Sequence, residues 1–244
     1  NHSSPFTTPN SEYIVAGTRF SIPFPNSDVP INTYKENFKG ALSFIKVAPD
    51  NGQLSVAFQL ITPGFDYDLS HAGKGPSDGW FFFSCYNSEQ AYSLLEVNAS
   101  QKDKDFILAV NWKKIEEIVA QGKGTDMDAN YAHNIYDDKK HSATSEMIKK
   151  VRILKPEDVA GAMYYIPCPK SPHGADVDPT GEYIVGGGKL ASVIPVFSFK
   201  KIISAIDKKE FESDIEGIPV INYESALAGE VSNPGLGPLH TEFD

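Results

Sequence analysis

The chain has few cysteines, few basic residues and no long hydrophobic run, and each shortage excludes a class of protein. Two of its 244 residues are cysteine, Cys85 and Cys168, which excludes a disulfide-dense scaffold and a four-cysteine zinc site. Lysine and arginine total 22 against 32 acidic residues, and the net charge of −10 offers no footprint for a nucleic-acid backbone. No apolar run approaches the roughly 20 residues that span a bilayer. Nucleic acid and a membrane span are therefore not expected.

The sequence does contain a succession of short apolar segments between turn residues. They are rich in Val, Ile, Phe and Tyr and bounded by Pro, Gly, Asn or Asp, which is typical of β-strands. We predict strands at Glu12–Phe20, Leu42–Val47, Leu54–Ile61, Trp80–Ser84, Phe106–Trp112, Met163–Pro167, Glu182–Gly186 and Val193–Phe199. Two segments favour helices, Trp112–Gln121, with Gly122 as its C-cap, and Lys200–Lys208.

Internal repeats indicate how these strands are organised. PNSEYIVAGTR, from Pro9, and PTGEYIVGGGK, from Pro179, share six of eleven positions. ILAVNWKKIEEIV, from Ile107, resembles IPVFSFKKIISAI, from Ile194, 87 residues later. That spacing fits two units of about 40–45 residues, the size of a four-stranded propeller blade. The repeats predict an all-β propeller with short helices in the inter-strand connections, and chance similarity between β-segments is the alternative.

Three histidines occupy the same place in the repeat. His2 precedes Pro9 by seven residues, His173 precedes Pro179 by six, and His240 opens a segment that looks like a third copy. Equivalent positions on successive blades lie on a ring around one axis, and imidazole suits copper, zinc and iron. This pattern predicts a metal site made of histidines, and the alternative is that each histidine is a satisfied turn or capping residue.

The other polar segments support weaker hypotheses. His71, His133 and His141 lie in polar stretches and are expected to be exposed to solvent. The polar stretch Lys123–Ser145 is either a functional, partner-facing loop or a solvated insertion. The glycines 186–188 do not complete a phosphate-loop motif, so we attribute them to close backbone packing near an axis.

Three carboxylates, on Glu89, Asp103 and Asp105, flank a short apolar segment. Calcium prefers six to eight oxygen ligands, so a carboxylate pair with nearby carbonyls is a candidate calcium site. A solvated acidic face is the alternative. Neither the G-x-S-x-G nor the H-E-x-x-H motif of common hydrolases is present.

Several of these strings resemble nitrous oxide reductase. They are SCYNSE at Ser84–Glu89, KSPHGADVDPTGEY at Lys170–Tyr183, GGKL at Gly187–Leu190 and GLGPLHTEFD at Gly235–Asp244. The similarity extends over essentially the whole chain, and the two strings that contain histidine are highly specific to that family. The long stretch Lys123–Ser145 is similar to the family's divergent, Sec-exported branch.

The resemblance implies a fold and an activity. The family folds as a seven-bladed propeller, which holds a four-copper sulfide cluster called CuZ, followed by a cupredoxin domain that holds a dicopper centre called CuA. Its members are periplasmic homodimers that act in denitrification and reduce N2O to N2 and water with two electrons and two protons. A c-type cytochrome or a small copper protein of the periplasm supplies the electrons.

The resemblance also implies roles for particular residues. His173 and His240 match copper ligands of CuZ, and His2 matches a third. The family's calcium site matches five residues, namely the carbonyls of Tyr86 and Val97, the carboxylates of Glu89 and Asp103, and Ser171, where the family often has asparagine. Copper and calcium are therefore the cofactors to expect.

The same resemblance implies that residues 1–244 are a partial propeller, truncated at both ends, without the cupredoxin domain. Such a fragment is expected not to assemble CuZ and to aggregate when made alone, because open sheet edges would be exposed. Two alternatives remain at this point. One is a non-catalytic propeller that serves as a binding platform, and the other is a calcium-dependent propeller hydrolase or lactonase with a carboxylate-rich axis.

Overall fold

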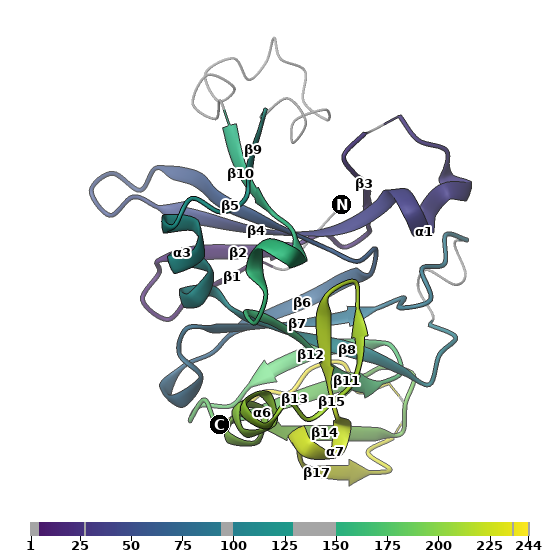
Figure 1. Cartoon of the computed structure of the whole chain (residues 1–244). Coiled ribbons are helices and arrows are strands. Elements are labelled where there is room, and N and C mark those ends of the chain that lie inside the picture. Colours follow the sequence, from purple (N-terminus) through teal and green to yellow (C-terminus); the bar gives the residue numbers. More distant parts are fainter. Residues whose placement is uncertain (1–4, 27, 94–99, 129–149, 236, 244) are drawn as a thin grey trace.

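The computed structural model describes residues 5–26, 28–93, 100–128, 150–235 and 237–243 (Figure 1). The described residues form three sheets, and each sheet contains four antiparallel strands that follow one another in chain order. The chain is therefore mostly β, as predicted. Within these segments, no helix is long and apolar enough to cross a membrane.

The first sheet begins near the amino-terminal end of the described chain. Its four antiparallel strands are β1 (Phe6–Thr7), β2 (Tyr13–Gly17), β4 (Phe38–Val47) and β5 (Leu54–Thr62), and β3 (Ile22–Pro23) pairs with β4. A later hairpin, β9 (Thr125–Asp128) and β10 (Lys150–Leu154), extends this sheet because β10 pairs in parallel with β5. The first part of the predicted Lys123–Ser145 loop is thus a strand, and residues 129–149 lie outside the described residues.

The second and third sheets repeat the four-stranded arrangement. The second contains β6 (Asp66–Ala72), β7 (Trp80–Tyr86), β8 (Lys104–Asn111) and β11 (Met163–Pro169). The third contains β12 (Pro172–Val177), β13 (Tyr183–Gly188), β14 (Val193–Ser198) and β17 (Leu227–Ser232). The hairpin β15 (Phe211–Ile215) and β16 (Ile218–Ile221) extends the second sheet.

Helices occupy the connections between strands. They are α1 (Tyr34–Asn37), α3 (Trp112–Ala120), α6 (Phe199–Lys208) and α7 (Tyr223–Ala226), with single 3-10 turns at Ile31–Thr33, Gly75–Ser77 and Pro156–Val159. Both predicted helices are present, and each has an N-cap side chain that accepts a backbone N–H three residues later. Gly122, with a φ of 81°, ends the first of them as predicted.

The first sequence repeat corresponds to the same turn in two sheets. Between β1 and β2, the N–H of Thr8 donates to the carbonyl of Tyr13 at 3.0 Å. Between β12 and β13, the N–H of Asp178 donates to the carbonyl of Tyr183 at 2.9 Å. In each turn the first residue's side chain also accepts the N–H of the tyrosine. Similarity of sequence here is therefore similarity of structure.

The second repeat is also structural, but its period differs from the prediction. Both copies are a third strand followed by a helix, β8 with α3 in the second sheet and β14 with α6 in the third. The 87-residue spacing is thus one unit rather than two. The unit is longer than a simple four-stranded blade because a helix and a hairpin lie between its third and fourth strands.

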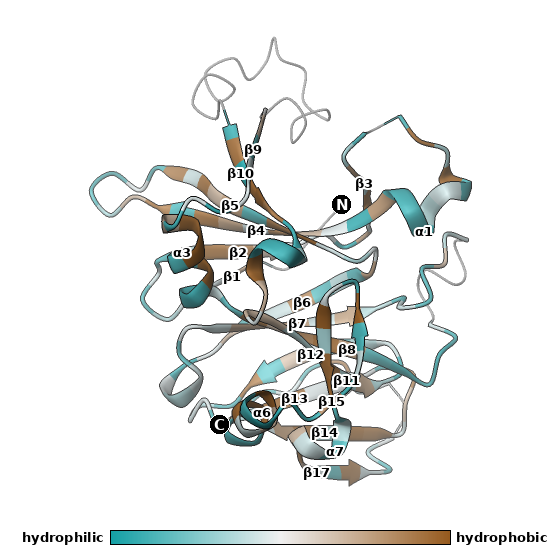
Figure 2. Cartoon of the chain, viewed as in Figure 1, coloured by the Kyte–Doolittle hydropathy of each residue, from teal (hydrophilic) through white to brown (hydrophobic). Residues whose placement is uncertain are grey.

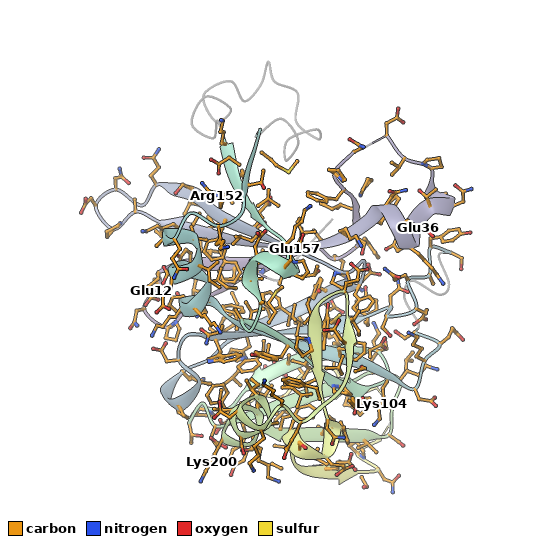
Figure 3. All side chains as sticks on the ribbon, in the orientation of Figure 1. Glu12, Glu36, Lys104, Arg152, Glu157 and Lys200 are labelled. Atoms are coloured by element: carbon orange, nitrogen blue, oxygen red, sulfur yellow. The ribbon has the colours of Figure 1, made fainter. Side chains whose placement is uncertain are left out.

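Two hydrophobic clusters lie on opposite faces of the second sheet, where Figure 2 shows concentrated hydrophobic colour. Along β7 the side chains alternate between them: Phe81 and Phe83 belong to one cluster, and Trp80 and Phe82 to the other. The second sheet is therefore buried on both faces, which explains the continuous apolar run of β7. Charged side chains such as Glu36 and Lys200 lie at the periphery (Figure 3).

The two cysteines are free thiols on opposite faces of this sheet. Cys85 belongs to the first cluster and Cys168 to the second, and burial raises the pKa of both thiols. We expect the thiols of the native chain not to react with a thiol reagent on the timescale of minutes. Both thiols stay protonated, and both are buried away from the reagent. Labelling with an aromatic disulfide, with and without denaturant, checks this. Rapid labelling of the folded chain, or a disulfide between the two, would contradict it.

Candidate metal site

The first strands of the three sheets lie next to one another. β6, of the second sheet, contacts both β1 and β12. His71 of β6 lies between them: its ring centroid is 4.4 Å from that of Phe6, and its Nδ1 accepts the N–H of Val177 at 3.1 Å. The prediction that His71 is a solvent-exposed loop residue is therefore wrong.

Two of the three predicted copper ligands meet at this junction. The ring centroids of His173, in β12, and His240 are 4.8 Å apart, and the rings are close to perpendicular. The segment of His240 is held there because the N–H of Thr241 donates to Asp176 at 2.8 Å. The third predicted ligand, His2, lies outside the described residues.

Glycines allow the His240 segment to approach β12 and β13. A Cβ at Gly174 or at Gly187 would lie 2.6 Å from the carbonyl oxygen of Leu239, which is closer than real Cβ atoms come. The interpretation of the glycine run as a place of close backbone packing is confirmed at Gly187. A side chain at either glycine would displace the segment that places His240 beside His173.

Asp68, of β6, fixes the orientation of His173. Its carboxylate forms a short hydrogen bond with His173 Nδ1 and lies 3.4 Å from Arg19 Nε. Burial alone would raise the pKa of Asp68, but the hydrogen bond from His173 and the charge of Arg19 hold it below its usual value. The carboxylate therefore stays ionised and accepts a hydrogen bond from Nδ1–H of His173, which leaves Nε2 as the free ligand atom.

Two positively charged side chains lie near His173 and Asp68. Arg19 and Lys189 are equivalent positions of the first repeat, and their charged groups lie 4.7 and 4.8 Å from the ring centroid of Tyr86. Burial lowers the pKa of Lys189. Sequence reasoning missed Arg19 and Asp68, although the pairing of Arg19 with Lys189 in the repeat was a signal for both cations.

Four of the five predicted calcium ligands lie around one buried carboxylate, Asp105. One of its oxygens accepts the N–H of Ser88 at 3.1 Å and the other accepts the N–H of Ser171 at 2.8 Å. Asp105 thereby joins the end of β7 at Tyr86, and the segment with Glu89 that follows it, to the turn before β12. The carbonyl of Asp103 accepts the N–H of Lys170 beside the same turn.

Oxygen atoms without partners remain in this region. Glu89 Oε2, Ser88 Oγ and Ser171 Oγ are buried and form no hydrogen bond. Unpaired buried oxygens are costly, and a hard cation satisfies them. The fifth predicted ligand, Val97, lies outside the described residues. Within the described part of the chain, no group of three or more His, Cys, Asp or Glu side chains is close enough to hold a metal ion.

A second buried carboxylate, Asp66, makes the stability of the chain depend on pH. It accepts the N–H of Ser21 at 3.0 Å and the side-chain N–H of Asn87 at 2.9 Å. Burial raises its pKa from 3.8 to about 6, although these hydrogen bonds and Arg19 lower it. Between these two pH values the folded chain keeps a proton that the unfolded chain has lost, so stability falls as the pH rises.

We therefore expect the native chain to lose up to about 3 kcal/mol of stability from this group between pH 4 and 7, at about 1.4 kcal/mol per pKa unit. Denaturant unfolding of the native chain and of Asp66→Asn across this pH range measures the effect. The substitution should remove this part of the pH dependence, whatever it does to the absolute stability. Parallel pH profiles for the two proteins would refute the assignment.

Comparisons with known proteins identify relatives. No protein-family model matches the sequence. Curated nitrous-oxide reductases match at low identity: 26% over 240 residues for the protein of Pseudomonas fluorescens and 24% over 236 residues for that of Stutzerimonas stutzeri. Each alignment covers 97% of this chain but 32% of the relative. The chain thus spans about a third of the length of the curated relatives it matches.

Among solved structures, hydrazine synthase of Kuenenia stuttgartiensis matches with a TM-score of 0.49 and 12% identity, over 96% of this chain and 50% of the synthase chain. This similarity is too low to support an inference. The sheets and the paired histidines define a mostly β chain with a candidate site for a metal bound by imidazole. The sequence comparisons show that it is a distant homologue of nitrous-oxide reductases, which are oxidoreductases, as its histidine motifs predicted.

Proposed function

We propose that the chain is part of the CuZ domain of a nitrous oxide reductase, which reduces N2O to N2 and water. The observation that carries the proposal is the approach of His173 and His240, whose ring centroids lie 4.8 Å apart. The resemblance of the two histidine motifs to those of the reductases implies copper-ligand roles for the same two residues, which are 67 positions apart in the sequence. The motifs and the observed proximity thus support the same pair of side chains.

Residues 1–244 would be consecutive blades of a propeller. Three four-stranded antiparallel units in chain order, with their first strands in contact, support this arrangement. The remaining blades and the CuA cupredoxin domain would belong to sequence other than these residues. The proposal includes a periplasmic homodimer that receives electrons from a c-type cytochrome or a small copper protein.

Copper would be held by His173, His240 and His2. Neutral imidazoles suit copper, and the free Nε2 of His173 is a suitable donor atom. The metal cluster would supply electrons to N2O, an inert molecule and a poor ligand. Asp68 holds His173 in one tautomer and orientation, and Arg19 keeps Asp68 in place.

Calcium would be held by Glu89, Asp103, Ser171 and the carbonyls of Tyr86 and Val97. The unpaired oxygens of Glu89 and Ser171 fit a hard cation. Terbium, which substitutes for calcium, should show luminescence sensitised by Tyr86, and calcium should displace it. Glu89→Gln should weaken calcium binding at least about tenfold because one charged ligand is lost. Glu117→Gln, at an exposed position of α3, is the control, and equal affinities of both variants would contradict the site.

The proposed function is tested on the protein expressed with the flanking sequence of its gene. We expect several copper ions per chain after anaerobic purification from a host with copper-cluster assembly factors. The purified protein should consume N2O with a reduced dye as electron donor. A folded but copper-free and inactive product, from a host that matures a control reductase, would refute the proposal.

A further inference from the structure

Each hairpin outside the four-stranded units reaches back to the preceding sheet. β9 and β10 lie in the chain between β8 and β11 of the second sheet, but β10 pairs with β5 of the first. β15 and β16 lie between β14 and β17 of the third sheet, but β16 pairs with β11 of the second. Figure 1 shows both hairpins beside sheets that are not formed by their own unit.

The two junctions share one geometry. β5 and β11 are the fourth strands of their units, and each receives a strand that runs parallel to it. The pairs are Gln59 with Ile153 in the first junction and Tyr165 with Val220 in the second. Both hairpins follow a helix that begins after a third strand, α3 or α6. The junction is therefore a repeated device that closes the outer edge of one sheet with a strand from the next unit.

The two incoming hairpins share the same distribution of apolar and polar residues. The incoming strand is apolar and buried on its core side, as at Val151 and Ile153 of β10 and at Val220 of β16. The first strand of the hairpin is polar, with Asp126 in β9 and Asp214 in β15. A hairpin of this kind buries its inner strand and exposes its outer one, so the sheet ends in a strand with charged side chains.

The third sheet has a fourth strand of the same kind, but no described hairpin pairs with it. β17 is the fourth strand of its unit and pairs with β14 on one side, and no other described strand pairs with it. Most of β17 is exposed, including Val231 at 51%. At one end, Lys201 Nζ donates to the carbonyl of Leu227 at 2.6 Å, and the rest of the edge faces outward (Figure 1).

We propose that the outer edge of β17 is the docking site for a β-hairpin of the same kind, whose apolar second strand runs parallel to β17. The occupant is a polypeptide segment outside residues 1–244 that resembles β15–β16: a polar strand, a tight turn and an apolar strand after a helix. Backbone hydrogen bonds along Ala228–Ser232 supply affinity, and the incoming apolar side chains cover Val231. This inference does not depend on the proposed copper chemistry.

The test uses this chain's own hairpin as the probe. A second copy of Lys209–Asn222 is appended after Asp244 through a flexible Gly/Ser linker, which gives it an effective concentration of about 1 mM at β17. Hydrogen exchange, measured by mass spectrometry, then reports on the amides of residues 227–232. We expect at least tenfold slower exchange there than in the chain without the extra copy, and no change in β5.

The control carries Val220→Pro in the appended copy alone, so the native fold is untouched. Proline cannot donate to a ladder, and this copy should give no protection. Self-association is a second readout, and it should be lower with the intact appended copy than with the proline copy. Equal exchange and equal self-association in the two proteins would overturn the proposal. Protection of β17 that rises with concentration in the unmodified chain would also overturn it, in favour of pairing between two copies.

Discussion

Replacement of His173 by alanine is expected to abolish N2O consumption and to lower the copper bound per chain in the copper-loaded protein. His173 is in β12, its Nδ1 is engaged by Asp68, and its Nε2 remains free for a metal. Loss of a partner that orients a ligand costs 10–100-fold in metal affinity or activity, so loss of the ligand itself should cost at least about 100-fold. Copper analysis and N2O consumption by the same preparation measure both effects.

The matched control is His71→Asn, on the neighbouring strand β6. The amide oxygen of asparagine can accept the N–H of Val177 as His71 Nδ1 does, so the strand contact is kept. This variant should retain copper and activity because His71 has no assigned role at the metal. If His173→Ala retains full copper and activity, or if His71→Asn loses as much, the ligand assignment is wrong.

The two histidines could be predicted from the sequence because each lies in a short, recognisable motif. The motifs around His173 and His240 are each contained in a few residues, and the repeat placed them in equivalent positions. The partners that orient the pair could not be predicted in this way. Asp68 lies 105 positions before His173, and only the contact between β6 and β12 makes it a neighbour.

The same distinction explains which strands were predicted. All eight predicted strands are present, and each contains buried apolar or aromatic side chains. β6 and β12 were missed because their sequences, DYDLSHA and PHGADV, are polar. Their polar side chains are satisfied across sheets, as when Ser84 Oγ donates to the carbonyl of His173 at 2.7 Å. The candidate site thus lies on polar strands at the junction of the sheets. These are also strands whose sequences give little indication of β-structure.

The unit length was mispredicted for a related reason. A period of 40–45 residues assumes that the fourth strand directly follows the third. Here α3 with its hairpin, and α6 with its hairpin, separate those strands and pack elsewhere. Parallel pairing of β10 with β5 joins residues about 90 positions apart, and no local sequence pattern predicts such a contact.

Replacement of Asp105 by alanine is expected to cost about 3–5 kcal/mol of folding stability. Asp105 has no exposed surface, and its two oxygens accept the backbone N–H groups of Ser88 and Ser171. Each buried donor left without a partner costs about 1–3 kcal/mol, and the more so because the lost acceptor is charged. Alanine would leave both donors unpaired and would release the link between the end of β7 and the turn before β12.

Denaturant unfolding in the presence of a chelator measures this effect without a contribution from bound cation. Asp103→Ala is the matched control, since Asp103 is two positions away but exposed, and its change should stay within about 0.5 kcal/mol. Asp105→Asn should fall between the two, because an amide keeps one acceptor for one of the two N–H groups. If Asp105→Ala is no less stable than Asp103→Ala, Asp105 does not hold the two segments together, and the calcium ligands on them are not pre-arranged.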